Sequence, residues 1–179
     1  MPATISINRA PVLTLWAAVV AERLGHSRDE ALTLGRAVAG MNAQAKAVHL
    51  GLREATPPGE KGRRRAAAGP QSVELLGRAV PVVRTPRGLR AAKDGKPESA
   101  EAVERYLAGK FGDSLAEVRS AMTALAARFT PAELAESAYA LYEKFRPEIP
   151  AGTRGWGAKG VLDVAGLAKL KPRAAAKRS

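Results

Sequence analysis

Basic side chains surround one turn of the sequence, and their chemistry suits contact with phosphate groups. The turn, Thr85–Gly88, contains a proline and a glycine, and Arg84, Arg87, Arg90 and Lys93 lie in or beside it. Guanidinium and ammonium groups form charge-assisted hydrogen bonds with phosphate oxygens. We therefore expect a β-hairpin that contacts a nucleic-acid backbone or minor groove. The alternative is a solvated surface hairpin whose charges protect its edges from pairing with other chains.

Two other basic segments contain residues suited to the same partner. One is a triplet of arginines in a loop rich in glycine and proline, and the other is a glycine-rich loop with a tryptophan between two cations. The indole ring can stack on a base while its neighbours bind phosphate, and glycine lets the backbone approach closely. The alternative role for the tryptophan is to anchor the helical core. The residues concerned are Arg63, Arg64, Arg65, Arg154, Trp156 and Lys159.

The segment Ala21–Arg28 resembles the core of bacterial helix-turn-helix motifs. It has a small residue, a glycine four positions later for the turn, and a serine after the turn. The resemblance implies that the second helix enters the major groove of DNA, with Arg28 and Arg36 toward the bases. Asp29 and Glu30 open that helix, where their charge would face phosphates. An ordinary pair of antiparallel helices explains the same pattern.

The positive charge is concentrated in parts of the chain. The formal net charge is +12, with segments 53–97 and 149–179 contributing +7 and +6, segment 98–148 contributing −3, and the first 52 residues +2. Concentrated positive charge on flexible segments suits a polyanion, because each phosphate contact releases counterions. An anionic membrane would require a basic amphipathic helix, which these segments lack. We expect nucleic acid as the partner, DNA rather than RNA, and no membrane.

No residue pattern indicates catalysis, a cofactor or a metal. The chain has no cysteine and two histidines, which excludes disulfides, thiolate chemistry and cysteine-ligated metals. We therefore predict a non-enzymatic protein without cofactor or metal, in the cytoplasm. One alternative stays open for the apolar segment 11–24, which can be either a core helix or part of a signal peptide.

Apolar residues at steps of three and four predict five helices. With 46% hydrophobic and 4% aromatic residues, the core must consist of Ala, Leu and Val. Capping boxes mark two helix starts, Ser27 with Glu30 and Thr130 with Glu133, and Asp113 is expected to cap another. The predicted helices span residues 8–24, 27–51, 98–111, 113–129 and 131–146, followed by a short one capped by Asp163.

The expected fold is mainly α, a compact helical domain with a small β-hairpin and a basic, partly disordered C-terminal tail. Residues 72–92 are the only predicted β region, and Pro81 should restrict the hairpin to a sheet edge. The expected organisation is 1–52 helical hairpin, 53–97 basic loop and β-hairpin, 98–150 three-helix segment, and 151–179 glycine-rich loop and tail.

The sequence therefore predicts a nucleic-acid-binding protein with a transcriptional or architectural role. The alternative is a protein–protein adaptor. In that case the acidic helices of residues 98–148 bind a protein partner or a second copy, and the basic segments only keep the chain solvated.

Overall fold

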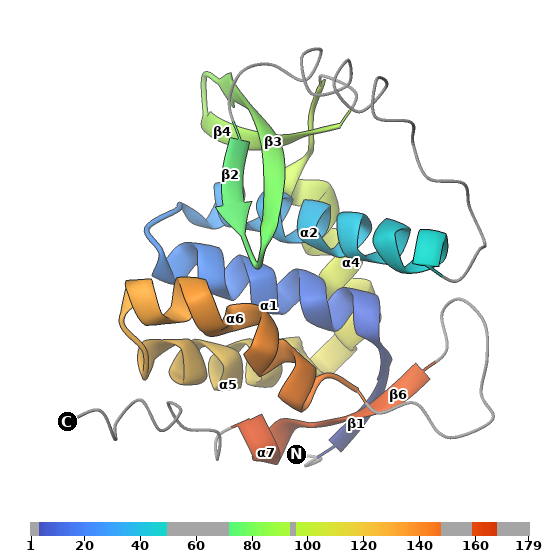
Figure 1. Ribbon diagram of the computed structural model, residues 1–179. Coiled ribbons are helices and arrows are strands. Elements are labelled where there is room, and N and C mark those ends of the chain that lie inside the picture. The colour runs from blue at the N-terminus through green and yellow to red at the C-terminus, as the bar shows by residue number, and fades with distance from the viewer. Residues whose placement is uncertain (1–3, 50–71, 94–95, 148–158, 168–179) are drawn as a thin grey trace.

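The body of the protein is a set of packed helices, with a small antiparallel sheet standing against one side (Figure 1). The fold comes from a computed structural model that describes residues 4–49, 72–93, 96–147 and 159–167. The described elements are β1 (Thr4–Asn8), α1 (Arg9–Arg23), α2 (Arg28–His49), β2 (Ser72–Leu75), β3 (Arg78–Thr85), β4 (Gly88–Lys93), β5 (Lys96–Pro97), α4 (Ala100–Phe111), a 3-10 turn (Gly112–Ser114), α5 (Leu115–Ala127), α6 (Pro131–Phe145), β6 (Lys159–Asp163) and α7 (Val164–Leu167). The predicted mainly α class is confirmed.

Helix α1 is the centre of the hydrophobic core. It lies between α2 and the α5–α6 pair (Figure 1), and every residue from Pro11 to Ala21 is buried. The Trp16 indole donates a hydrogen bond of 2.9 Å to the carbonyl of Ala138, and its ring meets Phe145 edge to face at 5.2 Å. The apolar segment near the N-terminus is thus a core helix in this fold. None of the helices in the described ranges is long and apolar enough to cross a membrane.

Helices α1 and α2 pack closely along their lengths. Gly25, at φ +111°, makes the turn between them, and Ser27 and Glu30 form the predicted capping box through two hydrogen bonds of 3.3 Å. Gly35 permits the close approach, because a Cβ there would lie 2.9 Å from the backbone nitrogen of Ala18 and against the carbonyl oxygen of Thr14. The predicted helical hairpin is therefore present.

Helices α4 to α6 follow the predicted ranges with one local difference. The capping box of Thr130 and Glu133 is present, and Ser99 caps α4. Gly112, at φ +56°, ends α4. The prediction that Asp113 caps the next helix is wrong, because Asp113 lies inside a 3-10 turn that joins the two helices without a side-chain cap.

The sheet β2–β3–β4–β5 contains the predicted hairpin and two further strands. Strands β3 and β4 pair antiparallel, with Thr85 opposite Gly88 at the turn. The expectation that Pro81 confines its strand to an edge is wrong, because β3 lies between β2 and β4. Pro81 is opposite Ser72, the first residue of β2. The ladder begins there, so a residue without an N–H is tolerated at that position.

A second sheet was not expected. Strand β1 pairs antiparallel with β6, with Thr4 opposite Asp163 and Asn8 opposite Lys159. The prediction that residues 72–92 are the only β region is therefore wrong. Asp163 caps α7, as predicted, by accepting a hydrogen bond of 2.9 Å from the N–H of Gly166. The predicted basic tail lies outside the described residues.

Candidate nucleic-acid interface

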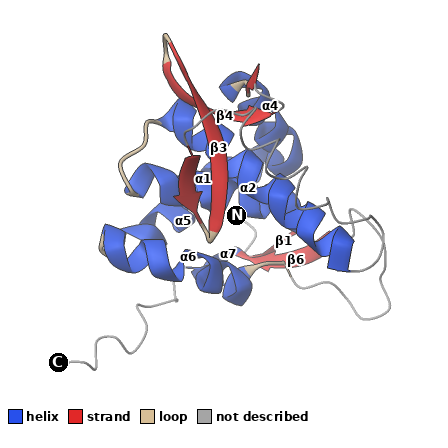
Figure 2. Ribbon diagram, turned by 45° about the horizontal axis from the view of Figure 1, so that its top comes forward, coloured by secondary structure: helices blue, strands red, loops and turns tan. Residues whose placement is uncertain are grey.

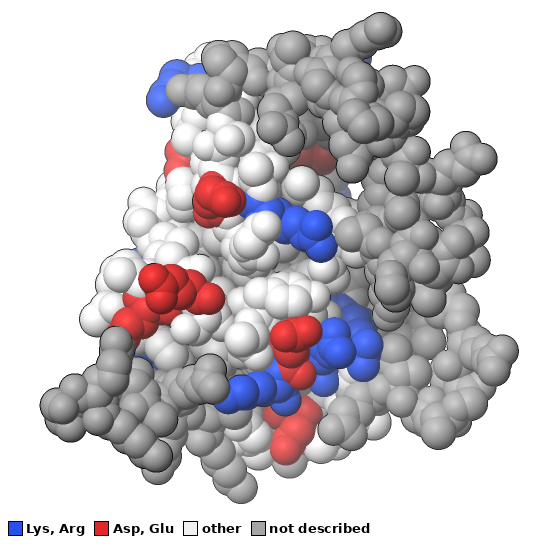
Figure 3. Space-filling view, viewed as in Figure 1, with Lys and Arg blue, Asp and Glu red and all other residues white. Residues whose placement is uncertain are grey.

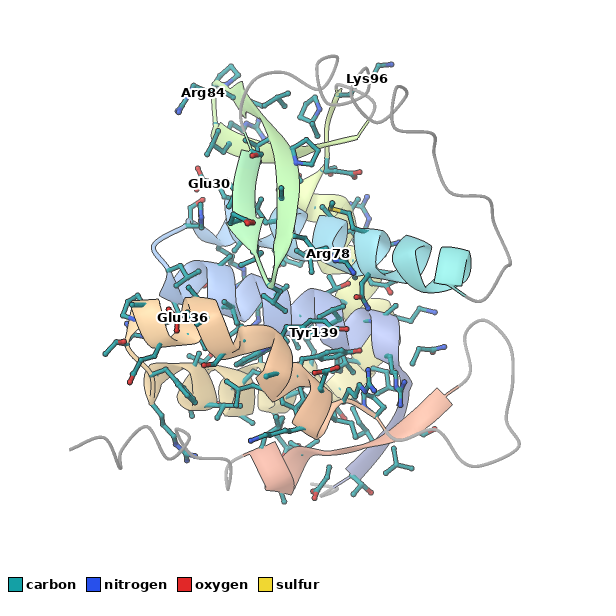
Figure 4. The ribbon with its side chains drawn as sticks, in the orientation of Figure 1. Glu30, Arg78, Arg84, Lys96, Glu136 and Tyr139 are labelled. Atoms are coloured by element: carbon teal, nitrogen blue, oxygen red, sulfur yellow. The ribbon has the colours of Figure 1, made fainter. Side chains whose placement is uncertain are left out.

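The far end of the β3–β4 hairpin presents exposed cations. The hairpin extends beyond the helices (Figure 2), and Arg84 and Lys96 lie at the same end of the molecule (Figure 4). Both are exposed, as is Arg87. The turn between the strands is ordered by Thr85, whose hydroxyl donates to the carbonyl of Gly88 at 2.8 Å and accepts from the N–H of Arg87 at 3.1 Å. The turn beside Arg84 and Arg87 is therefore ordered, whereas Lys96 comes from the next strand, β5.

The Arg87 side chain makes a loose contact with Glu101 of α4. Its guanidinium lies 3.8 Å from the carboxylate of Glu101, and the two side chains are 81% and 65% exposed. An ion pair this exposed contributes little to stability, since water and salt screen it. Arg87 can therefore exchange Glu101 for another anion at small cost.

Arg90 has internal partners. The residue is 7% exposed, its Nη1 donates to the carbonyl of Leu89 at 2.8 Å, and its Nη2 lies 3.6 Å from the carboxylate of Asp29. Two partners hold its guanidinium between the hairpin and the start of α2. Arg90 thus links two elements, and solvent reaches little of it.

The two arginines of the helix-turn-helix prediction face α4. Arg28 forms an ion pair of 2.7 Å with Glu104, and the guanidinium of Arg36 lies 4.5 Å from the centre of the Tyr106 ring. Contacts with β4 and α1 cover other sides of α2. Entry of α2 into a major groove stays a prediction, and it would require these contacts with α4 to open.

The remaining predicted residues cannot be placed in detail. Lys93 lies in β4 and Lys159 in β6, but their side chains are outside the described part of the structure. The basic triplet and the tryptophan loop lie wholly outside it, namely Arg63, Arg64, Arg65, Arg154 and Trp156.

In the folded chain, some of the basic side chains form ion pairs with acidic side chains from other segments. Glu101 and Glu104 of α4 form ion pairs with Arg87 and Arg28, and Glu22 of α1 lies 3.1 Å from Arg119 of α5. Figure 3 shows acidic and basic side chains interspersed among uncharged ones on the face it displays. This side of the molecule therefore does not form one continuous positive surface.

The structure also brings together a polar cluster that the sequence analysis missed. Arg78 of β3 and Tyr139 of α6 both donate to the side-chain oxygen of Asn42 in α2, at 3.1 and 3.2 Å. Nearby, burial raises the pKa of Tyr142 to about 12, while the positive charges of Arg146 and Arg9 act to lower it. Asn42, Arg78 and Tyr139 come from separate elements, so no local spacing signals their contact.

Comparison with protein-family models, with curated proteins and with solved structures gave no match. The site must therefore be interpreted from its own chemistry. Within the described ranges, no three acidic or histidine side chains are placed to hold a metal ion. The arrangement consists of exposed cations on a projecting hairpin, and such groups bind anions.

Proposed function

We propose that this protein binds nucleic acid, DNA in preference to RNA, and that the projecting hairpin makes the contact. The observation that carries the proposal is the exposure of three cations, Arg84 and Arg87 on the β3–β4 hairpin that extends beyond the helices (Figure 2) and Lys96 in β5 at the same end of the molecule as Arg84 (Figure 4). Neither Arg84 nor Lys96 makes an ion pair with a described residue. Their charges are therefore available to phosphates.

The proposed binding depends on phosphates more than on bases. Backbone contacts position a protein on the duplex without carrying sequence information. A net charge of +12 adds long-range attraction that salt screens. A sequence-independent, architectural role fits this geometry better than specific regulation, and the lack of cysteine fits a cytoplasmic location.

The test compares two triple variants with equal loss of charge. Arg84, Arg87 and Lys96 are replaced by alanine in one, and the exposed helix residues Arg105, Lys110 and Lys144 in the other. Fluorescence anisotropy with a labelled duplex at several salt concentrations gives the affinity and its salt dependence. The hairpin variant should lower the slope of log K against log salt by about 2 to 3, because each phosphate contact contributes about 0.9.

The control variant decides between a defined interface and diffuse attraction. The control variant should show the same slope of log K against log salt as the parent protein, to within the contribution of one phosphate contact. Equal losses in both variants would contradict the hairpin interface, and no binding at low salt would contradict nucleic-acid binding altogether. The same titration with RNA of equal length tests the preference for DNA.

A separate pair of substitutions tests the helix-turn-helix. If α2 enters the major groove, replacing Arg28 and Arg36 by alanine should reduce discrimination between DNA sequences by on the order of 1–3 kcal/mol for each lost base contact. If both arginines serve only α4, the variant should bind all sequences like the parent and melt at a lower temperature.

The adaptor alternative rests on the acidic helices. Glu101 and Glu104 of α4 already meet arginines of the same chain, which weakens that helix as a docking surface. On α6, Glu136 and Glu143 are exposed and make no ion pair with described residues. An absence of nucleic-acid binding would leave α6 as the candidate surface for a protein partner.

A further inference from the structure

Three ion pairs connect the hairpin, the start of α2 and the start of α4, so that each of these elements is joined to both of the others. In each pair the nitrogen and the oxygen lie between 2.7 and 3.8 Å apart. The pairs are Arg87 with Glu101, Arg28 with Glu104, and Arg90 with Asp29. All three arginines belong to the residues that the sequence predicts to contact nucleic acid. In the free protein they therefore have acidic partners from the same chain.

The two glutamates of α4 are neighbours on the surface of that helix. Glu101 and Glu104 are three positions apart, and residues at this spacing lie on the same face. The hydroxyl of Ser99, the N-cap residue of α4, donates to Oε1 of Glu101 at 3.3 Å. The other oxygen of the same carboxylate, Oε2, lies 3.8 Å from Arg87. One face of α4 thus directs two carboxylates toward cations of the hairpin and of α2.

The two pairs that involve α4 are open to solvent. The side chains of Arg28 and Glu104 are 55% and 50% exposed. Those of Arg87 and Glu101 are more exposed still. Exposed ion pairs change an equilibrium constant by a factor of up to about five each, so another anion can displace them. The pair of Arg90 differs, because its guanidinium is buried and also donates to a backbone carbonyl.

We propose that Glu101 and Glu104 form an autoinhibitory surface that competes with nucleic acid for Arg87 and Arg28. A carboxylate and a phosphate accept the same kind of hydrogen bond from a guanidinium group, so only one of them can use a given donor. In the free protein the carboxylates of α4 are the acceptors, and the phosphates of a nucleic acid displace them on binding. The affinity is therefore lower than the exposed arginines alone would give. This inference rests on the nucleic-acid binding proposed above.

The test compares two double variants of the full chain that change the net charge equally. One carries Glu101→Gln and Glu104→Gln, and the control carries Glu136→Gln and Glu143→Gln at exposed positions of α6. Figure 4 shows Glu136 well separated from Arg84 at the end of the hairpin. Fluorescence anisotropy with a labelled duplex measures the affinities, and circular dichroism checks that both variants fold. The α4 variant should bind about three- to tenfold more tightly than the control, because two exposed ion pairs no longer compete.

A second comparison repeats both double variants in a protein that carries Arg87→Ala and Arg28→Ala. There the α4 and α6 variants should bind equally, because the competition needs the two arginines. An advantage of the α4 variant that persists without the arginines would overturn the proposal, since it would show general repulsion of phosphate by acidic side chains.

Equal affinities of the α4 and α6 variants in the parent background would also overturn it. NMR of the parent gives an independent check, because the arginine Nε–Hε signals of Arg87 and Arg28 should shift when the duplex is added, and unchanged signals would contradict the displacement. A parent that binds no duplex at low salt would instead contradict the proposed function itself, so the two failures are distinguishable.

Discussion

The carboxylate of Glu30, in the first turn of α2, accepts a hydrogen bond of 3.1 Å from the backbone N–H of Leu89 in β4. Its other oxygen accepts from the N–H of Ser27 in the capping box. One turn later, the hydroxyl of Thr33 accepts from the N–H of Ala91 at 3.0 Å. Side chains of α2 thus satisfy two N–H groups of β4, and they fasten the hairpin to the helical body.

This relationship predicts a pH-dependent stability. Burial acts to raise the pKa of Glu30, but the N–H groups of Leu89 and Ser27 and the neighbouring His26 outweigh it and hold the pKa below the ordinary 4.5. A carboxyl with a lowered pKa in the folded state stabilises the protein above its ordinary pKa, and this stabilisation is lost as the pH falls. Glu30→Gln should cost on the order of 1 kcal/mol at pH 7.

Thermal unfolding followed by circular dichroism between pH 7 and pH 3 checks this. The difference between parent and Glu30→Gln should shrink as the pH falls below 4.5. Glu136→Gln, at an exposed position of α6, is the matched control and should change the melting temperature little at any pH. If the difference in melting temperature between the parent and Glu30→Gln stays constant down to pH 3, the charge of Glu30 does not contribute to stability and the prediction is wrong.

Replacing each of two glycines of α2 by alanine should change the free energy of unfolding in opposite directions. Gly35→Ala places a methyl group 2.9 Å from the backbone nitrogen of Ala18, so α1 and α2 must separate, at a cost of about 1–3 kcal/mol or more. A methyl group added at Gly40 would meet nothing within 4 Å among the described residues, and Gly40→Ala should stabilise the helix by about 0.5–1 kcal/mol. Urea denaturation measures both free energies of unfolding. Equal effects would contradict the close approach at Gly35.

Two hairpin arginines, Arg90 and Arg84, should differ in role, because the first stabilises the fold and the second is proposed to bind DNA. Arg90→Ala removes a buried guanidinium with two partners and should lower the free energy of unfolding by about 1–3 kcal/mol. Arg84→Ala, at an exposed position, should change it by less than about 0.5 kcal/mol and instead weaken DNA binding. Denaturation and anisotropy on the same samples test both statements. The opposite pattern would place Arg90 in the interface.

Tyr142 should limit stability at high pH. Burial raises its pKa to about 12, although the charges of Arg146 and Arg9 act in the other direction. A raised pKa in the folded state stabilises the protein below the ordinary pKa of 10.0, and this stabilisation is lost as the pH rises toward 12. Tyr142→Phe should match the parent at pH 7 and be more stable at pH 11. Absorbance of phenolate against pH follows the ionisation, and equal stability of parent and Tyr142→Phe at pH 11 would contradict the prediction.

Local signals in the sequence predicted the helices well. The capping boxes at Ser27 and Thr130 depend only on residues three positions apart, and both are present. The turn at Thr85–Gly88 is equally local and joins β3 to β4 as expected. The pairing of Thr4 with Asp163 was missed, because strands that meet from opposite ends of a chain leave no signal in either segment alone.

The sequence by itself determined the number and approximate bounds of the main helices and the excess of positive charge, because helix propensity and capping act within a few residues and charge follows from composition. Which cations remain available was decided only by the tertiary structure. Arg28 and Arg90 lie near carboxylates of distant segments, whereas Arg84 is exposed and Arg78 donates to the same Asn42 oxygen as Tyr139. Charges interact through space, so the availability of each arginine depends on which elements the folded chain packs around it.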